Sequence, residues 1–253
     1  MVYDLQKAST WKRIAAWLFD GILTGILAVA FALLLSMLLG YDSYNQQVEE
    51  AYNMYGTQYG IVFDITQEEY EAMTQAEKQN YDAAYDALVA DEEAMRAYSM
   101  TMSLTLVIMS LGILAAVLLW EFVIPLWFGN GQSLGKKIFS LCLVRPDGVK
   151  INNMQLFTRA ILGKYTVETM APIFIGIMIF WGIVGLSGTL CLIVLVIAQL
   201  LCLIISRNNS AIHDLLAGTA VVDISSQMIF RTTDDLIAYK KQIAAEQAAR
   251  QPY

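Results

Sequence analysis

Long runs of apolar residues separated by polar segments are the main pattern of this chain, and they predict helices that cross a membrane. A transmembrane helix needs about 20 mostly apolar residues. The stretches that meet this length give the expected spans, which are 13–39, 100–128, 166–185 and 188–206. The last two are split at Gly185-Leu186-Ser187-Gly188, a turn signal. A re-entrant pair within 166–206 is the alternative to two crossings.

Composition supports the same class. The chain is 57% hydrophobic and 15% charged, whereas about a quarter of a soluble domain is charged. A membrane β-barrel would show short alternating segments in place of long apolar runs. We therefore expect an all-α polytopic membrane protein. The 3 cysteines do not indicate a disulfide framework.

The basic residues predict the orientation. Of the 16 Lys and Arg, only Lys78 and Arg96 lie in the acidic segment 40–99. The others flank the expected spans on the opposite side, in 1–13, 129–165 and 207–253. Because basic residues favour the cytoplasmic side, we expect a plasma-membrane protein with both termini cytoplasmic. Trp11, Trp120 and Trp127 lie near the expected boundaries, as interfacial aromatic residues do.

The segment 40–99 is expected to be an acidic, helical, extracytoplasmic insert. Thr66 and Thr74 each precede a glutamate at capping-box spacing. No Gly or Pro follows Thr74 before the second span, so one unbroken helix is expected there. The insert is either a small external lid or an antechamber that attracts cations, or it is a solvated helical connection between two spans. Its scattered carboxylates do not have the spacing of a calcium loop.

The loop 129–165 is expected to be a cytoplasmic, interfacial unit. Its apolar residues from Ile138 to Val144 precede the turn Arg145-Pro146-Asp147-Gly148, which predicts a short hairpin. A separate amphipathic helix is expected over 154–164, capped by Asn152 or Asn153. Lys136 and Lys137 are expected to contact lipid phosphates.

Several motifs give the chain a family resemblance. They are Lys12-Arg13-Ile14 with Asp20, Gly131-Gln132-Ser133-Leu134-Gly135-Lys136-Lys137, Leu156-Phe157-Thr158-Arg159 after the turn at Arg145, and Ile212-His213-Asp214-Leu215-Leu216-Ala217-Gly218-Thr219. With these motifs the chain resembles the RDD family of membrane proteins, named for one arginine and two aspartates. The resemblance covers most of residues 1–225, and the segment 40–99 looks like an addition. It implies that Arg13, Asp20 and Asp214 are the name-giving residues. Some members are described as sodium/proton antiporters.

The ionisable residues near the cytoplasmic ends of the spans form the candidate site. Asp20 and Glu121 are expected at similar depth in antiparallel helices, where they could share a proton or hold a monovalent cation. Arg13 or Arg159 would balance the second charge, and Asp214 could accept Arg13 as a bidentate pair. Arg207 is expected at the same surface. The alternative is that these charges only fix the helix positions.

Two functions remain open for the chain. One is transport of small cations or protons at Asp20 and Glu121. The other is a membrane scaffold or accessory subunit that binds lipid or another membrane protein, including a second copy. The sequence contains no nucleophile–base pair, metal-ligand cluster, nucleotide motif or basic groove for nucleic acid, so we expect no enzyme, no cofactor and no nucleic-acid partner. Residues 226–253 are expected to form a cytoplasmic helical tail over 232–250.

Overall fold

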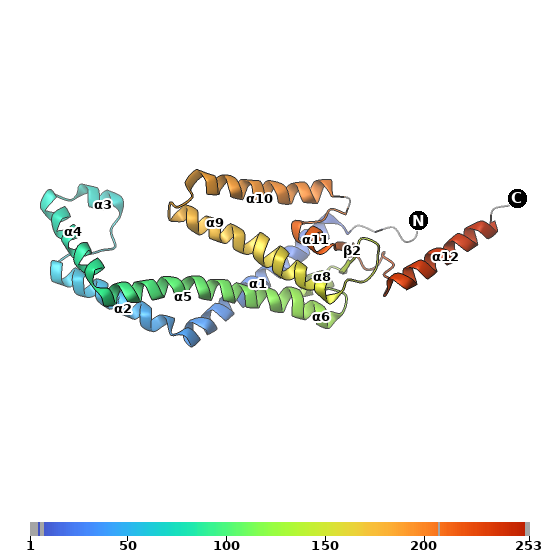
Figure 1. Cartoon of the computed structure of the whole chain (residues 1–253), viewed down its shortest axis with the longest axis horizontal. Coiled ribbons are helices and arrows are strands. Elements are labelled where there is room, and N and C mark those ends of the chain that lie inside the picture. Colours follow the sequence, from blue (N-terminus) through green and yellow to red (C-terminus); the bar gives the residue numbers. More distant parts are fainter. Residues whose placement is uncertain (1–4, 6–7, 207, 251–253) are drawn as a thin grey trace. The chain divides into compact units, whose positions relative to one another are not determined.

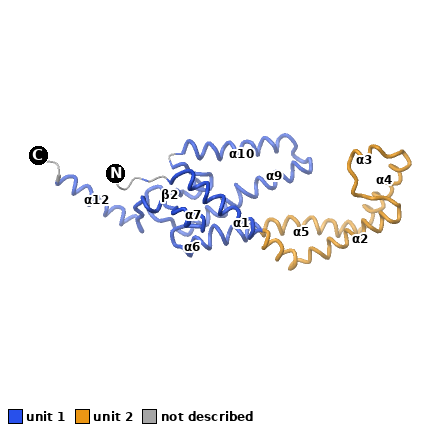
Figure 2. Tube along the Cα trace, turned by 180° about the vertical axis from the view of Figure 1, so that it is seen from behind, with its two compact units in different colours: residues 1–28, 113–253 blue, residues 29–112 orange. Residues whose placement is uncertain are grey.

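The protein is mostly helical in a computed structural model, which describes Leu5, residues 8–206 and residues 208–250 (Figure 1). It forms two compact units, one of residues 1–28 and 113–253 and the other of residues 29–112, coloured separately in Figure 2. In chain order the elements are α1 (Thr10–Leu39), α2 (Tyr41–Tyr59), α3 (Gln67–Ala72), α4 (Gln75–Ala90), α5 (Glu92–Val117), η1 (Leu118–Val123), α6 (Ile124–Phe128), α7 (Leu134–Ile138), β1 (Leu141–Val144), α8 (Asn153–Thr158), η2 (Arg159–Met170), α9 (Ala171–Phe180), α10 (Gly185–Ile205), α11 (Ile212–Ala217), β2 (Ala220–Asp223) and α12 (Thr233–Arg250).

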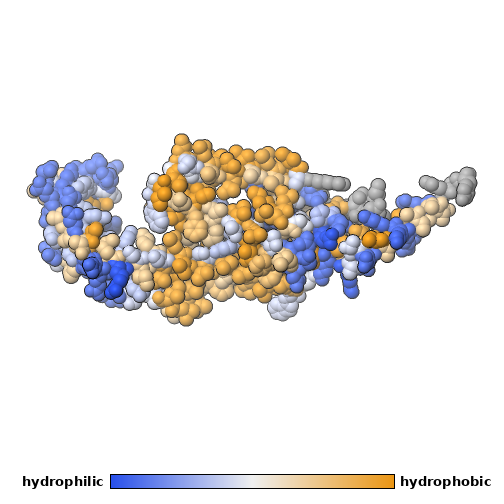
Figure 3. All heavy atoms as spheres, in the orientation of Figure 1, coloured by the Kyte–Doolittle hydropathy of each residue, from blue (hydrophilic) through white to orange (hydrophobic). Residues whose placement is uncertain are grey.

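Within the described residues, 4 helices are long and apolar enough to cross a membrane, which confirms the expected fold class. They are Thr10–Leu39, Glu92–Phe128, Asn153–Phe180 and Gly185–Ile205. In the first unit, hydrophobic residues gather over α9 and α10, whereas hydrophilic residues gather over α12 (Figure 3). This distribution is that of a protein whose apolar helix faces contact lipid.

The third span differs from the expected one. One continuous helix comprises α8, η2 and α9, so the amphipathic helix expected over 154–164 is part of the span. Asn152 begins it with a capping box, and the π-helical η2 continues it without a break. The turn to α10 lies at 181–184, before the Gly-Leu-Ser-Gly sequence in which it was expected. Gly188 lies within α10, where a Cβ would be 2.8 Å from Ile179.

The expected local hairpin is also replaced by a long-range pairing. β1 pairs antiparallel with β2, Leu141 opposite Asp223 and Val144 opposite Ala220. The turn at Arg145 forms, since Gly148 N–H donates to its carbonyl at 2.9 Å, but only one isolated bridge joins Val144 to Lys150. The segment after the turn is too short to form a second hairpin strand, because Asn152 caps α8 directly after it. β2 therefore pairs with β1 in its place.

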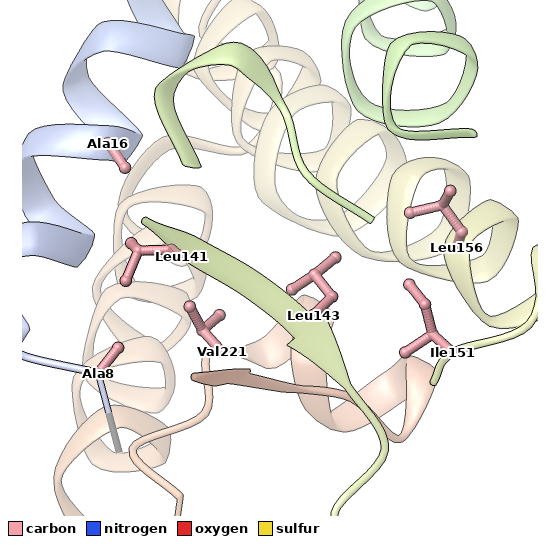
Figure 4. Close-up of a cluster of buried hydrophobic side chains, with 7 residues drawn as sticks. All are labelled: Ala8, Ala16, Leu141, Leu143, Ile151, Leu156 and Val221. Atoms are coloured by element: carbon pink, nitrogen blue, oxygen red, sulfur yellow. The ribbon is translucent and has the colours of Figure 1, made fainter. Parts of the chain in front are cut away.

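β1 is buried on both faces, so it organises the core of the first unit. Because side chains alternate across a strand, Leu141 and Leu143 face one apolar cluster while Cys142 and Val144 face another with Val222. The first cluster is shown in Figure 4. Its buried members come from β1, α1, α8 and β2 and from the segments just before α1 and α8, and they are Ala8, Ala16, Leu141, Leu143, Ile151, Leu156 and Val221. Burial raises the pKa of the Cys142 thiol to about 12.

The second unit contains the acidic insert, which is helical as expected. Thr66 and Thr74 both form capping boxes. Aromatic contacts hold its helices and loop together: Tyr70 of α3 packs edge-on against Tyr81 of α4 at 5.5 Å between ring centroids, and Phe63 of the α2–α3 loop packs edge-on against Tyr52 of α2 at 5.2 Å. The unbroken helix expected after Thr74 is wrong, because Asp91 ends α4 with an extended backbone and caps α5 by accepting the Ala94 N–H at 3.2 Å.

The tail forms a helix as expected. α12 begins after Thr232, whose backbone N–H donates to Asp235 at 3.0 Å while its hydroxyl accepts the Asp235 N–H at 3.2 Å. Leu236 anchors the first turn in a small apolar cluster with Val149, Phe230 and Tyr239.

Candidate functional site

Asp20 is buried within the apolar helix α1, and donors from two other segments hold its carboxylate. The residue is 3% exposed. Its Oδ1 accepts the indole N–H of Trp120 at 3.0 Å and the backbone N–H of Gly135 at 2.9 Å. Its Oδ2 accepts the hydroxyl of Ser133. Asp20 therefore fixes α1 to η1 and to the start of α7.

Gly135 lets α7 approach α1 this closely. A Cβ at this position would lie 2.6 Å from the carbonyl oxygen of Ala16 and 2.8 Å from Oδ1 of Asp20. Real side chains do not tolerate such distances, so only glycine fits here. Ser133 begins α7 as its N-cap, accepting the N–H of Lys136 at 3.4 Å. This short helix brings the lysine inward.

Glu121, from η1, is also 3% exposed, and it contacts cations from two other elements. Its Oε2 lies 3.4 Å from Nζ of Lys136 and 3.4 Å from the guanidinium of Arg159. Its Oε1 accepts from Lys164. Arg159 and Lys164 are five residues apart, which in an α-helix of about 3.6 residues per turn would point them well away from each other. The wider π-helical turn of η2 lets both reach Glu121.

Lys136 lies between the two carboxylates. Its ammonium is 3.4 Å from Glu121 and 3.8 Å from Oδ2 of Asp20, and it donates to the hydroxyl of Ser133 at 2.9 Å. Burial lowers the pKa of Lys136 to about 8. The expectation that this lysine contacts lipid phosphates is wrong, because the residue is 6% exposed. Lys137 is exposed, and its ammonium lies 4.0 Å from the ring centre of Phe128.

Arg159 extends the cluster to α11. Its Nε donates to Oδ1 of Asp214 at 2.9 Å, while Arg13 is 3.6 Å from Oδ2 of the same carboxylate and donates instead to the carbonyl of Asn209 at 2.6 Å. The bidentate pair expected between Arg13 and Asp214 is therefore wrong, because Arg159 takes the closer position. Asp214 is fully buried, and its cationic neighbours hold its pKa well below the usual range.

His213 connects the cluster to the third and fourth spans. Its Nδ1 lies 2.7 Å and 2.8 Å from the two carboxylate oxygens of Glu168, and its Nε2 lies 2.8 Å from the guanidinium of Arg159. Glu168 also accepts from Gln199 of α10 at 3.1 Å. Since a guanidinium only donates, Nε2 accepts and Nδ1 carries the proton. Burial lowers the pKa of His213, in agreement with this neutral form.

Taken together, these residues form one charge cluster in the first unit. Its carboxylates are Asp20, Glu121, Glu168 and Asp214, and its cations are Arg13, Lys136, Arg159 and Lys164. With His213 neutral, cations and carboxylates are equal in number. Within the described part of the chain, no group of three or more His, Cys, Asp or Glu side chains could hold a metal ion.

The motifs that line this cluster are those that carry the family resemblance. The sequence model of the RDD family matches residues 7–218. The chain belongs to the RDD family. No curated protein and no solved structure matches it. The matched range contains every member of the charge cluster, so the cluster is part of the RDD region, and the match ends before α12 begins.

The structure brings together the site residues expected from this RDD sequence. Asp20 and Glu121 lie in one cluster, with Lys136 between them, and Arg159 is the arginine that contacts Glu121. Arg13 and Asp214 lie at the other end of the cluster. Arg207 lies outside the described residues. Trp120, expected at the membrane interface, is buried and donates a hydrogen bond to Asp20.

Sequence reasoning missed the cluster residues that come from the loop 129–165 and from the motif at 212–219. Lys136 and Gly135 were assigned to a surface loop, although Ser133 is a residue type preferred at helix N-caps and does begin α7. His213 was assigned no role. A histidine next to an aspartate in an otherwise apolar motif was its only signal.

Proposed function

We propose that this RDD-family protein exchanges protons for small monovalent cations at Asp20, Lys136 and Glu121. The observation that supports this proposal best is the buried ammonium of Lys136 between carboxylates of two different spans. When the lysine loses its proton, the charge cluster, whose carboxylates and cations are otherwise equal in number, is left with one uncompensated negative charge in a site of low dielectric constant. A sodium-sized cation restores the balance, and reprotonation of Lys136 expels it.

The location of Lys136 supports the same mechanism. The residue lies on α7, outside the four helices long enough to span the membrane. A short helix on a loop moves more easily than a span, so the ammonium can leave the carboxylates without rearranging the helices. Ionisable residues buried among spans are functional candidates because they are costly to place there. The proposed role requires neither catalysis nor a cofactor.

The proposed orientation follows from the basic residues. Segments 129–165 and 207–253 carry most of them, and basic loops favour the cytoplasmic side. We therefore propose a plasma-membrane protein whose charge cluster faces the cytoplasm and whose acidic insert is outside. A reporter protein that is active only in the cytoplasm should be active when it is fused after α12. Activity of a reporter that needs an extracytoplasmic location would contradict this orientation.

The test of transport is cation-driven proton movement in sealed proteoliposomes containing the full chain. Sodium, potassium and lithium are added outside, and an internal pH dye reports the response. The unaltered chain is compared with Asp20→Asn, Glu121→Gln and Lys136→Gln, each checked for a monodisperse elution profile. Asp147→Asn is the matched control, because Asp147 pairs with Arg145 at 2.8 Å outside the cluster.

We expect flux in the unaltered chain and the control and none in the three cluster variants. Absence of flux in the unaltered chain, in vesicles where a known antiporter works, would overturn the proposal. A second candidate function, a scaffold or accessory subunit that binds a membrane partner or a second copy, would then take its place. The complete pairing of cations with carboxylates favours that candidate, since such a network also serves to fix helix positions.

A further inference from the structure

A second basic site lies apart from the charge cluster, in a pocket between the end of α6 and the segment before α12. The pocket has a volume of about 600 Å³ and is lined by Asn130, Lys150, Ile229, Phe230 and Arg231. Backbone pairing builds it, because Lys150 N–H donates to the carbonyl of Phe230 at 2.8 Å and Phe230 N–H donates to the carbonyl of Gly148 at 3.1 Å. Its wall is therefore fixed by the fold.

The polar groups of this pocket are suited to an anion. Lys150 and Arg231 supply two cations, and no carboxylate lines the pocket. Among the described residues, neither side chain has an ion-pair or hydrogen-bond partner, and both are exposed. This differs from the charge cluster, where every cation contacts a carboxylate. Two unpaired cations facing one space attract a group such as phosphate, which accepts charge-assisted hydrogen bonds from both.

The position of the pocket indicates where that anion comes from. Asn130 follows directly after the second span, which ends at Phe128, and Lys150 comes shortly before the third span, which begins at Asn153. Trp127, at the end of α6, is 85% exposed, as expected for an aromatic residue at the membrane interface. The pocket therefore lies at the level of lipid headgroups, and Ile229 and Phe230 give it an apolar wall.

We propose that this pocket binds the phosphate of an anionic phospholipid headgroup, held by Lys150 and Arg231. The amide of Asn130 is the further donor in the pocket, and the acyl chains of the lipid would extend along the ends of the two spans. Basic pockets next to spans recognise anionic lipids in this way. The inference is independent of cation exchange, because none of its residues belongs to the charge cluster.

The test measures lipid binding to the delipidated full chain in a neutral detergent. Short-chain phosphatidylglycerol, short-chain phosphatidylcholine, glycerol 3-phosphate and inorganic phosphate are each titrated, and native mass spectrometry and thermal shift report binding. The pocket variant is Lys150→Gln with Arg231→Gln. The matched control is Lys241→Gln with Arg96→Gln, which removes the same charges from exposed residues outside the pocket.

We expect phosphatidylglycerol to bind the unaltered chain and the control alike, and to bind the pocket variant at least about tenfold more weakly, since each charge-assisted hydrogen bond to the phosphate supplies a substantial part of the binding free energy. The charge-preserving variant Lys150→Arg with Arg231→Lys should restore binding, which separates loss of the site from misfolding. Equal weakening in the pocket variant and the control would overturn the proposal. Binding of inorganic phosphate as strong as that of the lipid would show a free-anion site instead.

Discussion

Gly163 of η2 lies directly against His213 of α11, so closely that a Cβ on the glycine would fall 2.6 Å from the Cα of the histidine. The same approach brings His213 to Arg159 and Glu168, which belong to the same helix as Gly163. The glycine therefore sets the distance between α11 and the third span. That distance decides whether His213 can contact Arg159 and Glu168.

Gly163→Ala should destabilise the protein. The added methyl group forces α11 away from the helix, and overpacking of this kind costs about 1–3 kcal/mol in free energy of unfolding. The measurement is denaturant unfolding in detergent. Gly176→Ala in the same span is the control, because nothing lies within 4 Å of a Cβ there. Equal stability of the two variants would show that α11 moves freely.

Gly135→Ala should disconnect α7 from α1. Its methyl group would occupy the space taken by the Ala16 carbonyl and the Asp20 carboxylate, so the N–H of residue 135 could no longer donate to Asp20. We expect a lower free energy of unfolding, again by about 1–3 kcal/mol, and loss of any cation flux. Gly25→Ala on α1 has open space and should keep both properties. Normal cation flux in Gly135→Ala would show that transport does not need the contact between α7 and α1.

The pairing of Arg159 with Asp214 should be strongly coupled. Both residues are buried, and leaving one charge without its partner costs about 3–5 kcal/mol. A double-mutant cycle of Arg159→Met and Asp214→Leu, followed by unfolding, should therefore be far from additive. The partly exposed pair of Arg145 and Asp147 is the control, and its coupling should be at most about 1 kcal/mol. Additivity within about 0.5 kcal/mol at the buried pair would contradict the structure.

Asp91→Ala should loosen the beginning of α5 in the second unit. The Asp91 carboxylate accepts the backbone N–H groups of Glu93 at 2.9 Å and Ala94 at 3.2 Å, and losing such a cap costs about 1 kcal/mol. Hydrogen exchange of the first turn of α5 should become faster, whereas Asp86→Ala on the exposed face of α4 should not change it. Unchanged exchange at α5 would mean that α4 and α5 do not need this cap.

The positions of the spans and the role of Asp20 as a candidate site residue could be predicted from the sequence, because each depends on local information. Apolar run length sets a span, and a carboxylate within one must face a partner. The pairing of β1 with β2 could not be predicted, since Leu141 and Asp223 are far apart and either strand alone is a short apolar run. The position of Lys136 depends on Gly135, whose close approach to Ala16 is visible only when both segments are placed.

The third span shows a second reason why sequence alone did not predict the site. Its polar residues Arg159 and Lys164 indicated an interfacial helix separate from the span, because their shared partner, Glu121, comes from another element. The π-helical turn that points Arg159 and Lys164 to the same carboxylate leaves no clear signal in residue type or spacing. Hydrophobicity therefore located the membrane region, whereas the charge cluster required the tertiary structure.

Stability should fall as the pH falls below about 6.5, because His213 is held in its neutral form. Arg159 donates to Nε2, Glu168 lies at Nδ1 and Asp214 lies 3.6 Å from Nε2, and burial lowers the pKa of the folded histidine. The unfolded chain, with an ordinary pKa near 6.5, then binds the proton more readily than the folded one. The free energy of unfolding decreases between that value and the lower folded pKa, by at most about 1.4 kcal/mol per pH unit for one proton.

This prediction is checked by following denaturant unfolding of the full chain between about pH 7.5 and pH 5, a range centred near the ordinary histidine pKa. Since the chain has 1 histidine, His213→Gln removes the only side chain whose ordinary pKa lies in this range. The variant should be less stable at pH 7.5, because it loses the hydrogen bond to Glu168, and its stability should vary less with pH. If both proteins lose stability equally on acidification, the histidine does not gain a proton on unfolding, and its neutral form in the charge cluster would have to be reassigned.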